Sequence, residues 1–315
     1  MLFAHFSLIG AGLSAKKMNK NPSKSPCFEV EDFKKSGFLF RQGIKHSQCR
    51  RIGEYFNEEE TEIRLFKTRF GLFLSPLMKS LIITGGSGAI GSMTAYWAVR
   101  QGWQVVLAYH KNETAAKNLW EDLTALGGKV HLFQGDLCKE QDRKDLIDFA
   151  LKECGSIDLL VNNFGAPHYK EFNEETAASI DEVLQTNLLS HMALTRLLLP
   201  HLLQKKSGAI INISSVWGQT GGACEVSYSA AKAGLIGFTK ALAKELAPSG
   251  ITVNCVAPGI VESKMLQDLN REELKKMVPT GRLCSGLDVA KAILFLAEQE
   301  QITGQVLSPN GGMYI

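Results

Sequence analysis

The stretch LIITGGSGAIG, Leu81–Gly91, joins a short β-branched run to a cluster of glycines and then to an amphipathic pattern. The run predicts a buried strand, and the pattern that follows predicts a helix. Glycine lets such a turn approach a pyrophosphate closely, and the helix N-terminus supplies N–H groups and positive dipole charge. The stretch predicts a dinucleotide-binding turn, although a tight connection without a ligand stays open on these residues alone. The candidate ligand contacts are Thr84, Gly85, Ser87, Gly88, Ile90 and Gly91.

Downstream of this turn, strand-like runs alternate with amphipathic stretches that are long enough for crossover helices. Because such crossovers are right-handed, the order predicts an α/β fold of the Rossmann type. We expect a doubly wound, seven-stranded parallel sheet with helices on both faces, in a single domain over residues 78–315. The predicted strands are Leu81–Thr84, Gln104–Tyr109, Val130–Gln134, Ile157–Asn162, Ala209–Ser214, Ile251–Val256 and Gln305–Leu307, and the predicted helices span 89–101, 113–126, 139–154, 175–204, 228–246 and 287–298.

Residues 1–77 show no such rhythm and predict a poorly ordered N-terminal extension. They hold 13 Lys and Arg against 8 Asp and Glu, a net charge of +5, whereas the remaining residues hold 22 against 24. This excess is modest and carries no motif, so neither nucleic acid nor a membrane surface is an expected partner. Because Met78 and Lys79 directly precede the first predicted strand, a functional protein that starts there is a further possibility.

The composition favours a globular protein of the cytoplasm. The chain has 315 residues, of which 45% are hydrophobic and 21% charged, enough to bury a full core. No apolar run reaches the ~18 residues that a membrane span requires. The seven cysteines include no C-x-x-C pair, which predicts neither a zinc site nor a disulfide framework. We therefore expect a reducing, cytoplasmic compartment and no metal.

The end of the second predicted strand bears on the choice between two pyridine nucleotides. A carboxylate there would accept the ribose hydroxyls of NAD, whereas a basic residue would suit the extra phosphate of NADP. His110 and Lys111 stand there and no carboxylate does, so we expect NADPH rather than NADH, unless Lys111 is only a solvated charge. Further candidate cofactor contacts follow the third and fourth predicted strands: Asp136, Leu137, Asn163 and Gly165.

Tyr228 and Lys232 are four residues apart in a predicted helix, so their side chains share one face. A free phenol has a pKa near ~10, and a nearby ammonium lowers it toward the working range of an acid or base. Ser215 ends the fifth predicted strand at the same edge and could hydrogen bond a carbonyl oxygen. Asn187, within the predicted helix 175–204, could hold a kink and a water, or be an ordinary surface amide.

These markers together resemble the short-chain dehydrogenase/reductase family over residues 80–315. They are the glycine-rich turn, N-N-F-G at residues 162–165, the catalytic-type residues Asn187, Ser215, Tyr228 and Lys232, and the pair Pro258-Gly259. Two positions depart from the family pattern. Ala89 stands for the usual middle glycine of the turn, and Phe164 stands for the usual alanine of N-N-A-G. The extra methyl of Ala89 should leave cofactor binding intact, whereas Phe164 could crowd the cofactor cleft.

The resemblance implies a role for each matching residue. Tyr228 would protonate the nascent alkoxide as hydride arrives, and Lys232 would also hold the nicotinamide ribose. Ser215 would orient the carbonyl, and Asn187 would support a water relay to Tyr228. Pro258, Gly259 and Val261 would lie at the nicotinamide end. The resemblance also implies a homotetramer packed through two long helices and the last strand, for which the largely apolar run Leu235–Leu246 is suitable.

The substrate predicted by resemblance is a ketone on a carrier. Residues 228–246 and 256–265 resemble bacterial 3-oxoacyl-[acyl-carrier-protein] reductases of fatty acid biosynthesis, with acyl carrier protein as the partner. Residues 215–226 also resemble a branch that reduces the 5-aminopentanone group on elongation factor P, where Glu225 could pair with an amine. The candidate substrate residues are Trp217, Gln219 and Glu225, although each could serve packing or solvation alone. A short lid over residues 261–279 would suit a substrate carried on a partner's arm.

Two other classes of function compete with a reductase. One is a nucleotide-binding regulator that keeps the fold without catalysis, and the presence of Ser215, Tyr228 and Lys232 argues against it. The other is an interaction protein that uses the basic segment 1–77, which lacks a recognisable binding motif.

Overall fold

The computed structural model describes residues 78–263, 266 and 270–315. The predicted extension 1–77 and five residues of the predicted lid, 264–265 and 267–269, lie outside the described residues.

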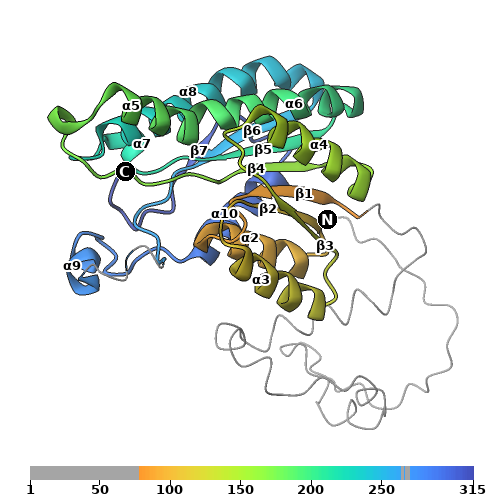
Figure 1. Ribbon diagram of the computed structural model, residues 1–315, viewed down its shortest axis with the longest axis horizontal. Helices are drawn as coiled ribbons and strands as arrows, with labels where there is room; N and C mark the ends of the chain where they lie inside the picture. Colours follow the sequence, from red (N-terminus) through yellow and green to blue (C-terminus); the bar gives the residue numbers. More distant parts are fainter. Residues whose placement is uncertain (1–77, 264–265, 267–269) are drawn as a thin grey trace, which may run out of the picture. The chain divides into compact units, whose positions relative to one another are not determined.

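The described chain forms one seven-stranded sheet in which every paired strand runs parallel to its neighbour (Figure 1). The strand order is β3-β2-β1-β4-β5-β6-β7, so the chain winds outward from β1 in one direction and then from β4 in the other. This order confirms the predicted doubly wound Rossmann-type sheet. The strands are β1 Ser80–Thr84, β2 Gln104–Tyr109, β3 Val130–Gln134, β4 Leu159–Asn162, β5 Gly208–Ile213, β6 Ile251–Val256 and β7 Val306–Leu307.

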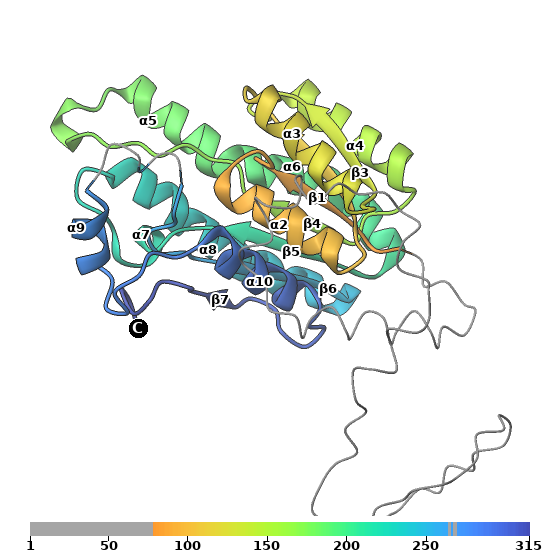
Figure 2. The same cartoon turned by 90° about the horizontal axis from the view of Figure 1, so that it is seen from below.

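Helices cover both faces of the sheet. The first group of α2, α3 and α10 packs on one face, and the second group of α4, α6 and α8 packs on the other (Figure 1 and Figure 2). The longer helices are α2 Ala89–Arg100, α3 Glu113–Ala125, α4 Glu140–Cys154, α5 Ala177–Leu184, α6 Ser190–Lys205, α8 Val226–Leu246 and α10 Gly286–Ala297. The short ones are α7 Trp217–Thr220 and α9 Arg271–Lys276, with 3₁₀ turns at Phe172–Glu174 and Ala247–Ser249.

The interior strands are apolar on both sides because helices cover both sides. All the residues of β1, β2, β4 and β6 are buried. Beneath α4, α6 and α8 the main core joins sheet residues such as Ile82, Val106 and Ile210 to helix residues such as Leu198 and Leu246. This packing leaves the carboxyl ends of the strands as the place where polar side chains from separate segments meet.

The predicted helix 175–204 is interrupted in the structure. A π-helical turn, Gln185–Leu189, separates α5 from α6, and it contains Asn187. The sequence allowed Asn187 to hold a kink here, but it does not identify the π-helical turn, which is a rare form within helices. The short helices α7 and α9 were not predicted.

Candidate active site

The glycine-rich turn after β1 is built by close backbone contacts. Gly85 has a φ of +64°, which favours glycine. A Cβ placed on Gly91 would lie 2.3 Å from the carbonyl oxygen of Gly85, so a side chain there would collide with the turn itself. Gly88 is the N-cap of α2, and its N–H donates to the Gly85 carbonyl at 3.1 Å. The tight turn therefore aims the N-terminus of α2 at the carboxyl edge, an arrangement that suits a pyrophosphate.

Thr84 and Asn163 lock the turn to the end of β4, at the point where the strand order reverses. The Asn163 side-chain amide donates to the Thr84 carbonyl at 2.8 Å, and the Thr84 hydroxyl accepts from the Asn163 backbone N–H at 2.8 Å. The same hydroxyl donates to the Val161 carbonyl at 3.1 Å. Ligands of open α/β sheets bind at such a switch point, so these residues stand where a dinucleotide would cross the sheet.

The residues predicted to bind the adenosine end lie beside β2 and β3. His110 and Lys111 are exposed at the end of β2. Asp136 follows β3 and accepts a hydrogen bond from the Cys138 backbone N–H at 3.1 Å. Leu137 is 6% exposed and packs in the main core, so its backbone is the part left for contact with a cofactor.

Pro258, Gly259 and Val261 occupy the carboxyl end of β6. The Pro258 carbonyl accepts a hydrogen bond from the Val216 N–H at 2.8 Å, which ties this segment to the end of β5. A Cβ on Gly259 would lie 3.0 Å from the Cα of Asn310, so the C-terminal segment packs closely there. Val261 forms an isolated parallel bridge with Cys284.

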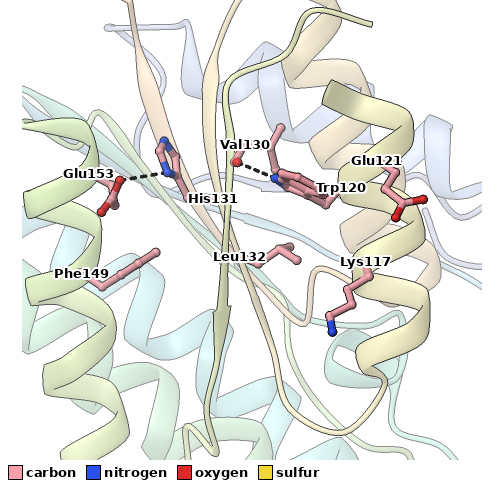
Figure 3. A pocket seen from close by; sticks show the side chains of 8 residues that line it. All are labelled: Lys117, Trp120, Glu121, Val130, His131, Leu132, Phe149 and Glu153. Carbon is pink, nitrogen blue, oxygen red and sulfur yellow. Dashed lines mark hydrogen bonds and ion pairs between the residues drawn. The ribbon is translucent and has the colours of Figure 1, made fainter. Parts of the chain in front are cut away.

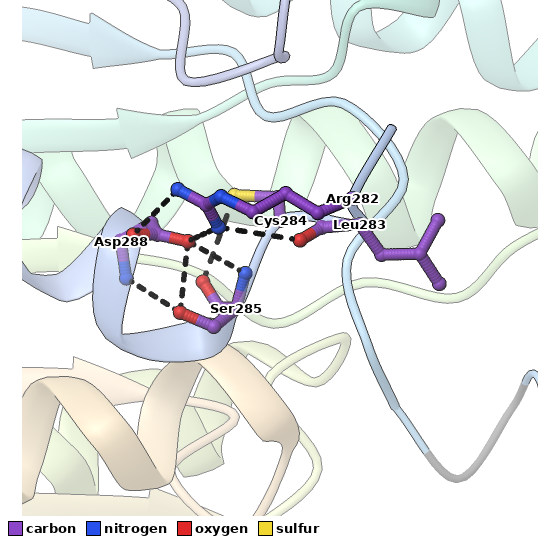
Figure 4. A network of polar contacts seen from close by, with 5 residues as sticks. All are labelled: Arg282, Leu283, Cys284, Ser285 and Asp288. Carbon is purple, nitrogen blue, oxygen red and sulfur yellow. Dashed lines mark hydrogen bonds and ion pairs between the residues drawn. The ribbon is translucent and has the colours of Figure 1, made fainter. Parts of the chain in front are cut away.

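A polar network holds the start of α10 against the glycine-rich turn. Arg282 donates to Asp288 at 2.8 Å, and Asp288 and Ser285 form a reciprocal cap at the N-terminus of α10 (Figure 4). A Cβ on Gly286 would lie 2.4 Å from the Ala89 carbonyl oxygen. Because α10 and α2 approach this closely, the network supports the first turn of α2 from the side.

Tyr228 lies in the first turn of α8, and its phenol is near the side chain of Ser215, which follows β5. Burial, and then the charge of Glu225, raise the pKa of Tyr228 to about 12, whereas the Ser215 side chain opposes the rise. The direction contradicts the expectation that Lys232 lowers this pKa. The phenol is therefore fully protonated at neutral pH and is poised to donate its proton.

Lys232 is 3% exposed and donates to the Ile213 carbonyl at 2.9 Å. Its Nζ lies 5.6 Å from the centroid of the Tyr228 ring, so the predicted pairing of the two side chains on one helix face is present. Burial lowers the pKa of Lys232 to about 8, because a low-dielectric interior disfavours the ammonium.

Asn187 is buried and bridges the π-helical turn to the loop after β4. Its side-chain nitrogen donates to the carbonyls of Val183 and Ala166 at 3.1 Å each, and its side-chain oxygen accepts from the Ala166 N–H at 3.2 Å. A Cβ on Gly165 would lie 2.7 Å from the Asn187 oxygen and 3.4 Å from Lys232 Nζ. Asn187, Gly165 and Lys232 therefore lie together, as the sequence predicts. The alternative reading of Asn187 as a surface amide is wrong.

The ring of Phe164 packs against α6 and the main core, although its Cα and Cβ lie next to Gly85 of the glycine-rich turn. Its ring stacks on His191 of α6, with centroids 4.3 Å apart and planes 2° from parallel, and it packs against the main core. Burial, and then the charge of Lys232, lower the pKa of His191 to about 3, so the imidazole is a neutral partner for the ring. The expected crowding of the cleft is thus relieved by an aromatic partner that the sequence analysis missed.

The predicted substrate residues have different surroundings. Glu225 is half-buried, and burial raises its pKa, whereas the nearby side chain of Trp217 opposes the rise. The charge of Glu225 also acts on Tyr228, which places this carboxylate near the phenol. Gln219 accepts a hydrogen bond from Ser308 at 2.8 Å and so joins α7 to the C-terminal segment.

A hollow of about 500 Å³ lies elsewhere, on the edge strand β3 (Figure 3). Trp120 donates to the Val130 carbonyl at 2.9 Å within it, and His131 lies 3.2 Å from Glu153. Its lining residues come from α3, β3 and α4, and none of them is a predicted site residue. We therefore place the candidate active site at the carboxyl edge, around Tyr228.

Residues 78–263, 266 and 270–315 contain no group of three His, Cys, Asp or Glu side chains that could hold a metal ion. No described helix combines the length and apolarity of a membrane span.

Comparison with known proteins gives a consistent result. Residues 79–274 match the family model for short chain dehydrogenases. The chain is 40% identical over 75% of its length to a Bacillus subtilis protein named "Uncharacterized oxidoreductase YmfI", and 36% identical over 76% to the 3-oxoacyl-[acyl-carrier-protein] reductase FabG of Staphylococcus aureus; it covers 99% of each. The structure of ElxO with NADP bound is 31% identical, with a TM-score of 0.70, over 75% of this chain and 98% of ElxO. Together with the sheet order, these matches show that the chain belongs to the short-chain dehydrogenase family of NAD(P)-dependent oxidoreductases.

Proposed function

We propose that this protein is an NADPH-dependent ketone reductase, and that its substrate is a 3-oxoacyl thioester carried by acyl carrier protein. The observation that carries the reductase assignment is the partly buried phenol of Tyr228, which lies near the side chain of Ser215 and beside Lys232. A phenol with a raised pKa holds its proton until a stronger base forms next to it, as an alkoxide does during ketone reduction.

The residues of the carboxyl edge fit a dinucleotide. The cradle formed by Gly85, Gly88 and Gly91 has no room for side chains at its narrowest point, and Lys111 stands exposed where the extra phosphate of NADPH would lie. The ElxO structures, which carry NADP and NADPH, support the same choice of cofactor. When bound, NADPH supplies the hydride that the carbonyl carbon accepts.

The protein's own residues would complete the reduction. Ser215 donates a hydrogen bond to the carbonyl oxygen and fixes its position, and Tyr228 gives its phenolic proton to that oxygen as the C–O double bond becomes a single bond. Lys232 lies beside the phenol, and Asn187 lies near Lys232. These two residues would pass a replacement proton to Tyr228 after it has donated its own. The product is a secondary alcohol.

The choice of a 3-oxoacyl thioester is supported by the names of relatives that are 35–36% identical to this chain. We further propose that the protein acts in the cytoplasm. We also propose that it forms a homotetramer, because exposed apolar side chains such as Leu189 and Met192 lie on the long helical segment around the start of α6. The regulator without catalysis is the weaker hypothesis because the phenol, serine and lysine are assembled.

One observation favours a second candidate, the 5-aminopentanone group on elongation factor P. Glu225 is a half-buried carboxylate near both the phenol and the side chain of Trp217. A carboxylate in this position would attract the ammonium of an aminoketone, whereas an acyl chain gains nothing from it.

A direct comparison of substrates tests the proposal. Purified protein is given NADPH with acetoacetyl-acyl carrier protein in one assay and with aminopentanone-modified elongation factor P in the other. We expect NADPH oxidation with the first and a much lower kcat/KM with the second. The reverse ranking would assign the second substrate, and oxidation with neither ketone would refute the proposed reductase.

A further inference from the structure

Glu175 has a side chain that is completely covered, although it lies in a surface loop before α5. Its Oε2 accepts a hydrogen bond from the hydroxyl of Ser227 at 2.5 Å, and the same oxygen lies 3.5 Å from Nε2 of His168. Its Oε1 has no hydrogen-bond partner among the described residues. Ser227 and His168 therefore provide the polar contacts of a carboxylate that solvent does not reach.

These contacts join three segments at one point. His168 belongs to the loop after β4, Glu175 directly precedes the N-cap of α5, and Ser227 is in the first turn of α8. Two further observations place the same segments together: α5 packs on α8, and the Lys170 N–H donates to the Cys224 carbonyl at 2.7 Å. Ser227 is 4% exposed and is the residue immediately before Tyr228.

A hydrogen bond from a hydroxyl to a buried carboxylate is short and strong, and loss of either partner leaves a buried polar group unpaired. Movement of the first turn of α8 away from Glu175 would carry that penalty. The contact therefore restrains the turn that carries the phenol, because Ser227 belongs to the same turn of α8 as Tyr228.

Glu225 is the carboxylate whose charge raises the pKa of Tyr228. The contact of Glu175 is with the neighbouring residue Ser227, so its effect on the phenol is expected through the position of the turn.

We propose that Glu175 is a positioning residue, which holds Tyr228 in place for proton donation through its hydrogen bond with Ser227. The inference rests on the proposed ketone reduction, in which a small displacement of the phenol from the carbonyl oxygen would slow the reaction.

A matched pair of variants at one position tests it. Glu175→Met fills a similar volume without an acceptor, and Glu175→Gln keeps an acceptor for Ser227. We expect Glu175→Met to lower kcat about tenfold and Glu175→Gln to keep kcat within about twofold of the original, with an unchanged Kd for NADPH and an unchanged pH profile. The exposed neighbour provides the control, Glu174→Gln, which should behave as the original protein.

The partner residue is tested in the same way. Ser227→Ala should lower kcat by a similar factor, and the double variant Glu175→Met with Ser227→Ala should be no slower than either single variant, because both remove the same contact. Additive losses, or equal kcat values for Glu175→Met and Glu175→Gln, would overturn the proposal.

Hydrogen exchange separates this inference from the proposed function, because it needs no substrate. We expect faster amide exchange in the peptide Val226–Lys232 of Glu175→Met than in the original protein, and unchanged exchange in the peptides of the distant strands β2 and β3. Equal exchange rates refute the positioning role whatever the turnover. Faster exchange, in a protein that reduces no ketone, would retain the restraint on Tyr228 and reject the reductase.

Discussion

The ammonium of Lys232 donates to the carbonyl of Ile213 at 2.9 Å and lies 5.6 Å from the ring centroid of Tyr228. The lysine is thus held by the end of β5 rather than by the phenol. Both side chains are shifted toward their neutral forms, since burial lowers the pKa of Lys232 to about 8 and raises that of Tyr228 to about 12. The protein by itself therefore maintains a protonated phenol, the form needed by a general acid.

Replacement of Lys232 by Met should change how stability depends on pH. The pKa of Lys232 is about 8 in the folded chain against 10.5 ordinarily, so the unfolded chain binds the extra proton between these values. Stability of the original protein then rises with pH across this window, and the cost of the buried ammonium is fully present below it. The stability of Lys232→Met relative to the original should fall by on the order of 2 kcal/mol from pH 7 to pH 10.

Denaturant unfolding of the two proteins at both pH values measures this difference. A difference in free energy of unfolding that stays constant between pH 7 and pH 10 would show that Lys232 titrates at its ordinary pKa, and that burial does not discharge it.

Tyr228→Phe should abolish most of the turnover without loss of the cofactor. Removal of a general acid costs about 10²- to 10⁴-fold in rate, whereas the ring and its packing stay in place. Steady-state NADPH oxidation gives kcat, and quenching of protein fluorescence gives the Kd for NADPH. Tyr314→Phe removes the hydroxyl of a tyrosine that is 44% exposed and should leave both values unchanged. Normal turnover of Tyr228→Phe would remove this residue from the proton transfer.

Glu225→Gln should move the alkaline limb of the pH profile to lower pH. The charge of Glu225 raises the pKa of Tyr228, so a neutral amide lets the phenol ionise more readily. Reduction needs the protonated phenol, and activity is lost as pH rises through its pKa, which is now lower. Profiles of kcat/KM against pH for the two proteins compare these limbs directly.

The same variant distinguishes the two candidate substrates. Because the carboxylate would pair only with an ammonium, Glu225→Gln should lower kcat/KM for an aminoketone and leave that for an uncharged 3-oxoacyl thioester unchanged at neutral pH. An identical alkaline limb, together with equal effects on both substrates, would show that Glu225 does not face the phenol or the substrate.

The sequence predicts the strands of the sheet well because each strand can be identified from its own run of residues. The runs Gln104–Tyr109 and Ile251–Val256 coincide with β2 and β6, since buried parallel strands are continuous apolar or β-branched runs. The run Val130–Gln134 also coincides with a strand, the edge strand β3, of which only Val130 is buried. The predicted fourth strand begins two residues early, at Ile157, because an apolar residue outside the ladder looks the same in sequence. The helical period likewise identifies α5 and α6 but conceals the π-helical turn between them.

The sequence predicts which residues of the site lie together better than it predicts the burial and the contacts of each residue. A spacing of four residues brings Tyr228 and Lys232 together, but the pKa of each depends on burial by segments that are distant in sequence. The direction of Phe164 required its partner His191, which lies 27 positions away. Glu175 follows other acidic residues in a loop, so its burial left no local signal.

The cofactor preference is tested by Lys111→Glu. Lys111 is exposed at the end of β2, where a carboxylate would repel the phosphate that distinguishes NADPH from NADH and would accept the ribose hydroxyls of NADH. We expect kcat/KM for NADPH to fall about tenfold and that for NADH to stay the same or rise. Lys244→Glu makes the same change of charge on an exposed residue in the last turn of α8, at the end of that helix remote from Tyr228, and should alter neither value. A preference for NADPH that survives in Lys111→Glu would assign the recognition of the phosphate to another group at this edge, of which His110 is the adjacent candidate.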